Sequence, residues 1–247
     1  MSINGNFWKG VVVAVLAAAA VMSVSLRAAS AADQPALRIG IIGTGNIGGT
    51  LAAHWAKAGH PLMISSRHPE ELQDLAKALG SHVRVGTPQE AAAFGEVILL
   101  AVPYKATPQI GRDLAKELKG KILLDTGNPY PARDGAMATE ARKRGTGVAS
   151  AEFLPGVRLV RAFNAINWNS LRDEANRPGE RYAIPLAGDD AEALAVAQRL
   201  VRDAGFDPVV VGDLSHAREF DVGTRVYTEL NTAAELRQKL RLAPVSK

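Results

Sequence analysis

The chain has 247 residues, of which 47% are hydrophobic, 22% charged and 5% aromatic. This composition is typical of a globular protein and excludes a disordered, collagen-like or low-complexity chain. A net charge of +4 is too small for a protein whose main partner is a nucleic acid, and the absence of cysteine excludes disulfides, thiolate zinc sites and cysteine nucleophiles.

The first 32 residues differ in composition from the rest of the chain. They contain no Asp or Glu, and Lys9 precedes an apolar run that is followed by small residues up to Ala32. A basic start, an apolar core and an Ala-rich end indicate a secretory signal peptide. The apolar run is shorter than the ~20 residues that span a bilayer comfortably, so an uncleaved N-terminal anchor is the alternative.

We therefore expect a signal peptide or anchor at residues 1–32 and one domain at residues 33–247. Removal of the first segment takes away two basic residues and no acid, which lowers the net charge to +2. The expected location is outside the cytoplasm, in the periplasm, and the alternatives are a membrane-tethered or a cytoplasmic protein.

Beyond residue 32, apolar runs of strand length alternate with segments of helical length. Continuously apolar runs such as Val97–Val102 are typical of strands buried on both faces of a parallel sheet. The alternation predicts an α/β protein of the Rossmann type, a doubly wound, mostly parallel sheet with helices on both faces and right-handed crossovers. The predicted strands are 37–42, 61–65, 82–85, 97–102, 122–125, 157–163, 182–187 and 208–211, and the predicted helices are 46–59, 70–79, 88–94, 107–118, 168–174, 190–204 and 232–240.

A glycine-rich motif follows the first predicted strand and opens the first helix. In a dinucleotide site, Gly43 makes the tight turn, Gly45 allows the backbone to approach the pyrophosphate, and Gly48 allows close packing of helix on strand. The helix N-terminus then offers N–H groups to the phosphates. The motif predicts nucleotide binding, with a purely structural turn as the alternative.

The end of the second predicted strand indicates which dinucleotide binds. An NAD site places Asp or Glu there, whereas this chain has Ser65, Ser66 and Arg67. Two hydroxyls and a guanidinium can bind the 2′-phosphate of NADP(H), which an acid would repel. In the alternative reading, Arg67 lies on a surface loop and Ser66 caps the next helix.

The motifs together resemble the NADPH:coenzyme F420 oxidoreductase family, which includes the oxidoreductase domains of membrane ferric reductases. The resemblance covers nearly all of residues 37–215. The segments that carry it are Ile39–Gly48, Ser65–Arg67, Ala101–Tyr104, Leu124–Pro129, Val160–Ile166 and Leu186–Asp190.

The resemblance implies an NADP-dependent enzyme that transfers a hydride between NADPH and a small-molecule redox acceptor, either the deazaflavin coenzyme F420 or a flavin such as FMN or FAD. The protein would supply position and polarity, since the cofactor carries the chemistry. Carried over by position, the cofactor-binding residues are Gly43, Thr44, Gly45, Asn46, Ile47 and Gly48 at the pyrophosphate, Ser65, Ser66 and Arg67 at the 2′-phosphate, and Val102, Pro103 and Ala162 beside the nicotinamide.

The acceptor would face polar or aromatic side chains, and no catalytic acid is assigned. Asn164 stands where some deazaflavin-reducing relatives have a histidine, and an amide cannot titrate. Residues 214–220 could form one wall of the acceptor pocket, and Trp168 is expected in the core. The candidates at the acceptor are Asn164, Asn128, Tyr104, Tyr130 and His216.

Other functions have less support in the sequence. The histidines have no metal-ligand spacing, so no metal site is expected, and no nucleic-acid partner is expected. The second hypothesis is a non-catalytic NADP-binding module that acts as a sensor or partner subunit. The terminal predicted helix could cover the sheet or a second subunit, so a homodimer is possible.

Overall fold

The computed structural model describes residues 35–243. The predicted signal peptide or anchor lies outside the described residues, so it stays a prediction. Within residues 35–243, no helix combines the length and the apolarity needed to cross a bilayer. From Leu37 onward the described residues form a single compact unit.

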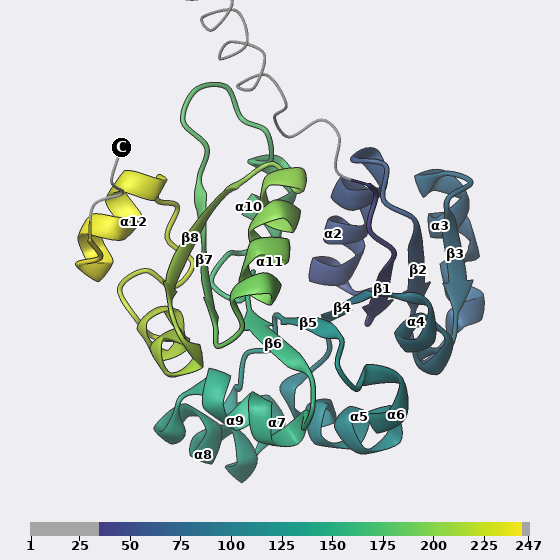
Figure 1. Ribbon diagram of the computed structural model, residues 1–247, viewed down its shortest axis with the longest axis horizontal. Helices are drawn as coiled ribbons and strands as arrows, with labels where there is room; N and C mark the ends of the chain where they lie inside the picture. The colour runs from purple at the N-terminus through teal and green to yellow at the C-terminus, as the bar shows by residue number, and fades with distance from the viewer. Residues whose placement is uncertain (1–34, 244–247) are drawn as a thin grey trace, which may run out of the picture. The chain divides into compact units, whose positions relative to one another are not determined.

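An eight-stranded sheet with strand order β3-β2-β1-β4-β5-β6-β7-β8 forms the centre of this unit (Figure 1). The order reverses between β1 and β4, as in doubly wound folds, which confirms the predicted α/β class. The strands are β1 (Ile39–Ile42), β2 (Leu62–Ser65), β3 (Val83–Gly86), β4 (Val97–Leu100), β5 (Ile122–Asp125), β6 (Arg158–Arg161), β7 (Ala183–Gly188) and β8 (Asp207–Gly212).

The last two strands run in the opposite direction to the first six. β7 pairs antiparallel with β6, and β8 pairs parallel with β7. The strand–helix alternation predicted a mostly parallel sheet, and the antiparallel pairing lies at the junction of β6 and β7. The chain between β6 and β7 has only a short helix, so it returns along the sheet without a full crossover.

Alternate residues of the central strands enter two separate cores. Ile41 and Leu99 pack under the helices of one face, while Ile42 and Leu100 pack under those of the other. The first face is covered by α2 (Asn46–Lys57), α3 (Gln73–Leu79), α10 (Trp168–Asp173) and α11 (Ala191–Asp203), and the second by α4 (Pro88–Phe94), α5 (Thr107–Asp113), α6 (Ala115–Leu118) and α9 (Thr146–Phe153).

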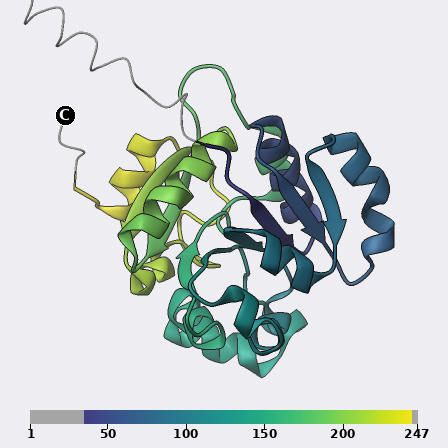
Figure 2. The ribbon, with the colours of Figure 1, turned by 45° about the vertical axis from the view of Figure 1, so that its right-hand side comes forward.

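A third apolar cluster covers the outer face of β7 and β8. It is formed with the 3-10 helix η3 (Leu214–Phe220) and the terminal helix α12 (Ala233–Leu240). The edge strand β3 with α3 and the terminal helix α12 lie at opposite ends of the sheet (Figures 1 and 2). Helix α12 therefore covers this sheet, which is one of its two predicted roles.

Three short helices between β5 and β6 have no counterpart in the sequence prediction. They are α7 (Pro131–Asp134), α8 (Ala136–Arg144) and α9, and they are separated by Gly135 and Gly145. Glycine at this spacing interrupts helical periodicity, so no helix-length pattern is visible in the sequence. The remaining short elements are η1 (Pro69–Leu72) and η2 (Tyr104–Ala106).

A fully buried ion pair joins the carboxyl ends of β5 and β6. Arg161 Nη1 lies 2.9 Å from Asp125 Oδ2, and the two residues are direct partners in the strand register. The same Nη1 donates to Gly127 O at 2.7 Å, while Gly127 N donates to Asp125 Oδ1 at 2.8 Å. Burial disfavours the charge on Arg161, but Asp125 and Asp221 hold its pKa above the ordinary value. The pair thus fixes both backbone groups of Gly127.

Arg161→Met is expected to destabilise the fold by about 3–5 kcal/mol, because it leaves the Asp125 carboxylate buried without its cation. The control is Arg158→Met on the same strand, whose side chain is 28% exposed and pairs with Asp190 and Glu192. That variant should lose no more than about 1 kcal/mol. Urea denaturation measures both, and equal losses would contradict the role given to the buried pair.

Candidate functional site

The glycine loop between β1 and α2 is held by close backbone packing. Gly43 has a φ of +97°, and a Cβ there would lie 2.4 Å from Ala101 O. A Cβ on Gly48 would lie 2.0 Å from Gly43 O. Glycine is therefore required at both positions by the fold itself, since side chains would meet backbone atoms.

Ser65 ties this loop to β2. Gly43 N and Thr44 Oγ1 each donate to Ser65 O at 3.0 Å, and Ser65 Oγ donates to Ile41 O at 2.7 Å. The residue is fully buried. The prediction that Ser65 binds the 2′-phosphate is therefore wrong, because its side chain lies inside the sheet and positions the loop instead.

The N-terminus of α2 has no side-chain cap. Its N-cap residue is Gly45, and the first turn carries no acid. Four other helices, α4, α10, α11 and α12, are capped by the side chains of Thr87, Asn167, Asp190 and Thr232. A Cβ on Gly45 would meet nothing within 4 Å, so space is open in front of this turn. The uncapped turn offers N–H groups and partial positive charge to an anion.

Ser66 and Arg67 follow β2 at the same edge of the sheet. Ser66 Oγ accepts from His68 N at 2.9 Å, which is a local turn contact. Arg67 is exposed and makes no hydrogen bond or ion pair with any residue between 35 and 243. A free guanidinium at this position is suited to a phosphate, so the role predicted for Arg67 stays open to test.

A cleft of about 400 Å³ lies at the carboxyl ends of the central strands, beside the uncapped turn. This is where open α/β sheets bind ligands. It brings together several predicted residues, namely Gly45, Asn46, Ile47, Val102, Pro103, Asn128 and Tyr130. The other residues that line it are Ala101, Thr126, Gly127, Arg133, Ile166, Asn167, Trp168, Tyr227 and Thr228.

Tyr104, a predicted acceptor residue, does not line this cleft. Its side chain is fully buried, its ring packs edge-on against Phe153 at 6.2 Å, and its hydroxyl accepts from Ser150 Oγ at 3.3 Å. Burial raises the pKa of Tyr104 to about 12. Tyr104 is therefore a core residue that packs at the start of η2.

His216 and Ala162 also lie away from the lining of the cleft. Ala162 is fully buried. His216 is exposed on η3, where its Nδ1 lies 3.0 Å from Asp213 Oδ1. Gly212, the last residue of β8, is in register through Ala187 with Arg161 at the end of β6. Because β8 runs antiparallel to β6, the chain enters η3 heading away from the carboxyl ends of the first six strands.

Asn128 lines the cleft, whereas Asn164, a predicted acceptor residue, is buried behind it and is not part of the lining. Asn128 Nδ2 donates to Asn164 O at 2.8 Å and to Tyr227 Oη at 3.3 Å, and Asn164 Nδ2 donates to Phe220 O at 3.4 Å. The Oδ1 atoms of both amides are buried and accept no hydrogen bond from any described residue. An unsatisfied buried acceptor costs about 1–3 kcal/mol, so a ligand with N–H donors would gain by meeting it.

Two strained residues adjoin Asn164 and Tyr227 in the chain. Phe163 has a φ of +58° and Thr228 a φ of +60°, a region that non-glycine residues seldom occupy. Thr228 N donates to Ala165 O at 2.8 Å, which joins the two segments. Strain of this kind is concentrated at functional sites, where the surrounding structure holds it.

Three large side chains are among the residues of the cleft that were not predicted to be there. Tyr227 and Arg133 lie outside every predicted element, and Trp168, which was expected in the core, is half-buried in the lining. The Arg172 guanidinium lies 5.0 Å from the Trp168 ring. No sequence pattern marks Tyr227, because it reaches the cleft through an irregular segment after η3.

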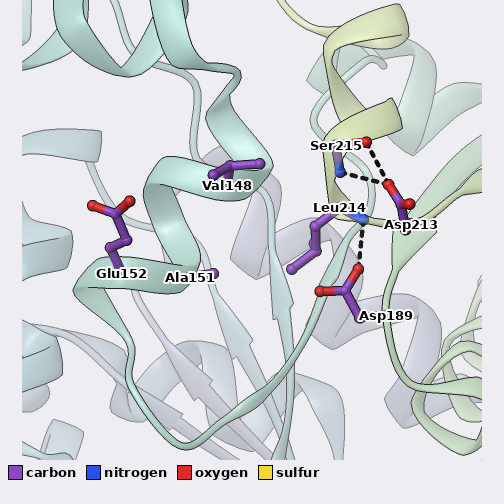
Figure 3. Close-up of a pocket in the computed structure, with 7 residues that line it drawn as sticks. All are labelled: Val148, Ala151, Glu152, Asp189, Asp213, Leu214 and Ser215. Atoms are coloured by element: carbon purple, nitrogen blue, oxygen red, sulfur yellow. Dashed lines mark hydrogen bonds between the residues drawn. The ribbon is translucent and has the colours of Figure 1, made fainter.

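A second hollow, of about 470 Å³, lies between α9 and η3 (Figure 3). Its acids hold the backbone: Asp189 accepts from Leu214 N, and Asp213 accepts from Ser215 N, each at 2.9 Å. The Ser215 hydroxyl contact lowers the pKa of Asp213 to about 2. Glu152 lies apart from them and pairs with Arg144. The acidic side chains that line this hollow therefore already have hydrogen-bond or ion-pair partners within the protein.

Comparison with known proteins shows which families this chain resembles. Residues 38–129 match the NADP oxidoreductases described as coenzyme F420-dependent. The F420-dependent NADP reductase of Methanothermobacter marburgensis is 29% identical over 215 residues, which cover 81% of this chain and 95% of that protein.

One further related protein and one solved structure are similar to this chain. The metalloreductase STEAP3 of Rattus norvegicus is 31% identical over 188 residues, which are 74% of this chain but only 36% of that protein. The crystal structure of a hypothetical protein, SMa0349, from Sinorhizobium meliloti has a TM-score of 0.67 at 25% identity and covers 80% of this chain and 96% of that one. With these matches, and with the sheet order and glycine loop described above, the chain is similar to the coenzyme F420-dependent NADP oxidoreductases, and the related proteins named here are reductases.

Proposed function

We propose that this protein transfers a hydride from NADPH to a flat ring acceptor, a deazaflavin such as coenzyme F420 or a flavin such as FMN or FAD. One observation carries the proposal. The uncapped first turn of α2 lines the same cleft as a group of aromatic and amide side chains. The proposal needs no partner beyond the small-molecule acceptor. The composition of residues 1–32 supports export as the protein's location, with a membrane tether as the alternative.

The nucleotide half of the proposal rests on groups that have no other partner. The first turn of α2 would bind the pyrophosphate through its N–H groups, and Arg67 would bind the 2′-phosphate. Val102 and Pro103 would pack beside the nicotinamide at the end of β4. When bound, NADPH supplies the hydride, so the chain's residues have only to hold the two rings in contact.

The acceptor half rests on the opposite wall of the cleft. The rings of Trp168 and Tyr227 line this wall. Asn128 Oδ1 has no hydrogen-bond partner among the described residues, so it is available as an acceptor. A planar heterocycle with N–H donors fits both kinds of group. A hydrated ferric chelate would leave the aromatic surface unused, which favours a ring acceptor over direct metal reduction.

Gly45→Ala is expected to weaken NADPH binding at least about tenfold, or about 1.4 kcal/mol, without a loss of stability. The added Cβ enters open space in the fold but occupies the approach of the pyrophosphate. The matched variant Gly48→Ala should instead lower stability by about 1–3 kcal/mol, because its Cβ meets Gly43 O. Urea denaturation and NADPH titration separate the two effects, and full NADPH affinity in Gly45→Ala would contradict the pyrophosphate site.

Arg67→Ala should weaken NADPH binding by about 1–3 kcal/mol and leave NADH binding nearly unchanged, because only NADPH carries the 2′-phosphate. Arg84→Ala, which removes an exposed positive charge from the neighbouring strand β3, is the control for net charge. Titration with both nucleotides checks the prediction. An equal loss for NADPH and NADH would place the 2′-phosphate elsewhere.

Purified protein should oxidise NADPH when F420, FMN or FAD is added, and more slowly or not at all with ferric chelates alone. Loss of NADPH absorbance with each acceptor in turn measures this. Tight NADPH binding without oxidation by any acceptor would instead favour the second hypothesis, a nucleotide-binding module without turnover.

A further inference from the structure

The cleft holds a pair of phenols that the proposed hydride transfer does not use. Tyr130 immediately precedes α7, and Tyr227 lies in the segment after η3. Their hydroxyls form a short hydrogen bond with each other. Both side chains are half-buried in the lining of the cleft, so the bonded hydroxyls lie where solvent is partly excluded and a ligand is expected.

The hydrogen bonds at Tyr227 leave one proton uncommitted. A phenol oxygen can accept two hydrogen bonds and donate one. Asn128 Nδ2 donates to Tyr227 Oη at 3.3 Å, which uses one acceptor position. If Tyr130 donates into the second, the hydroxyl proton of Tyr227 has no protein acceptor and is available to a ligand in the cleft.

Tyr130 is held in place from two sides. Its backbone N–H donates to Asp134 Oδ2 at 3.0 Å, and the Arg133 guanidinium lies 5.1 Å from the centre of its ring. Arg133 also bonds Asp134 and donates to Asn128 O at 2.7 Å. The same few groups therefore fix both Tyr130 and the amide that bonds Tyr227.

Burial keeps the phenol of Tyr227 in its neutral form, against the two cations that face it. Burial raises the pKa of Tyr227, so it carries its proton throughout the neutral range. The cations Arg133 and Arg161 face the pair from α7 and β6, and the nearby carboxylate Asp134 is engaged by Arg133. Burial opposes charge on Asp134, but its hydrogen bonds to Arg133 and Tyr130 N–H hold its pKa below the usual value.

Elimination identifies the pair as the proton source of the cleft. Among the residues that line it, only Tyr130, Arg133 and Tyr227 carry a titratable side chain. Arg133 does not release a proton in the physiological range. Hydride addition to a ring acceptor leaves negative charge on the ring, which a proton donor at this wall would neutralise.

We propose that Tyr227 is the proton donor of the cleft and that Tyr130 is its relay, an assignment that rests on the proposed hydride transfer. Tyr227 gives its hydroxyl proton to a ring nitrogen of the acceptor as the hydride of NADPH reaches the central ring, at a carbon in a deazaflavin or at a second nitrogen in a flavin. Tyr130 then gives its proton to the Tyr227 phenolate and recovers one from water. One hydride and one proton enter the acceptor, and NADP⁺ leaves, so the substrate class is a ring that takes up two electrons and one proton.

The test compares Tyr227→Phe and Tyr130→Phe with Tyr182→Phe, whose phenol lies under Arg177 before β7 and outside the cleft. In Tyr227→Phe, kcat with F420 or FMN should fall about 100-fold or more, while the Kd for NADPH stays unchanged. Its rate should fall as the pH rises through the neutral range, where the wild-type rate is flat. Tyr130→Phe should show a smaller loss, because water can replace the relay.

A second measurement needs neither turnover nor nucleotide. The chain has four tyrosines, so NMR of protein labelled at the tyrosine Cζ atoms gives four signals. Titration in alkali should shift the Tyr227 midpoint in Tyr130→Phe and leave the Tyr182 midpoint unchanged. An unchanged Tyr227 midpoint would show that the hydroxyls are not coupled and would overturn the relay.

The outcomes separate this proposal from the function on which it rests. Wild-type reduction of F420 or FMN with an unchanged rate in Tyr227→Phe would overturn the donor and leave the hydride transfer intact. A wild-type protein that reduces only ferric chelates would overturn both. A loss of rate in Tyr227→Phe that is independent of pH and accompanied by weaker NADPH binding would make Tyr227 a packing residue.

Discussion

The buried pair of Asp125 and Arg161 is the interaction on which the geometry of the cleft depends. It sits where two adjacent strands end, and it holds both the N–H and the carbonyl of Gly127. The next residue, Asn128, then reaches Asn164 and Tyr227. A buried ion pair is seldom a net source of stability compared with apolar packing, so its value here lies in fixing one loop conformation.

The floor of the cleft is rigid and its outer wall is less regular. The glycine loop, the end of β4 and the segment after β5 are joined to the sheet by backbone contacts and by Ser65. The outer wall comes from Trp168 and from Tyr227, which reach the cleft from a short helix and an irregular segment. Under the proposed function, nucleotide recognition would belong to the part of the fold common to Rossmann proteins, and acceptor recognition to the part that differs between them.

The sequence was sufficient to predict the first strand, its glycine turn and the helix that follows, because local backbone rules determine them. A strand, a glycine turn and a helix in succession leave few alternatives, and Gly43 and Gly48 are needed by packing alone. Ser65 shows the limit of this reasoning, since strand alternation decides which of two adjacent serines faces the interior. The predictions that placed His216 and Tyr104 at the acceptor failed for reasons that no local pattern reveals. His216 follows β8, whose direction is reversed, and the ring of Tyr104 is buried under α8 and α9.

The reversal of β7 and β8 gives the sheet two chemically distinct rims. The carboxyl ends of the first six strands face the cleft, whereas those of β7 and β8 face the opposite rim, where Asp190 meets Arg158 and Asp213 begins η3. From that second rim η3 leads back to the buried ion pair, where Asp221 Oδ1 lies 3.4 Å from Arg161 Nη2 and Phe220 O accepts from Asn164 Nδ2. A change in the loops of the second rim can therefore be transmitted through η3 to the side chains that fix the wall of the cleft.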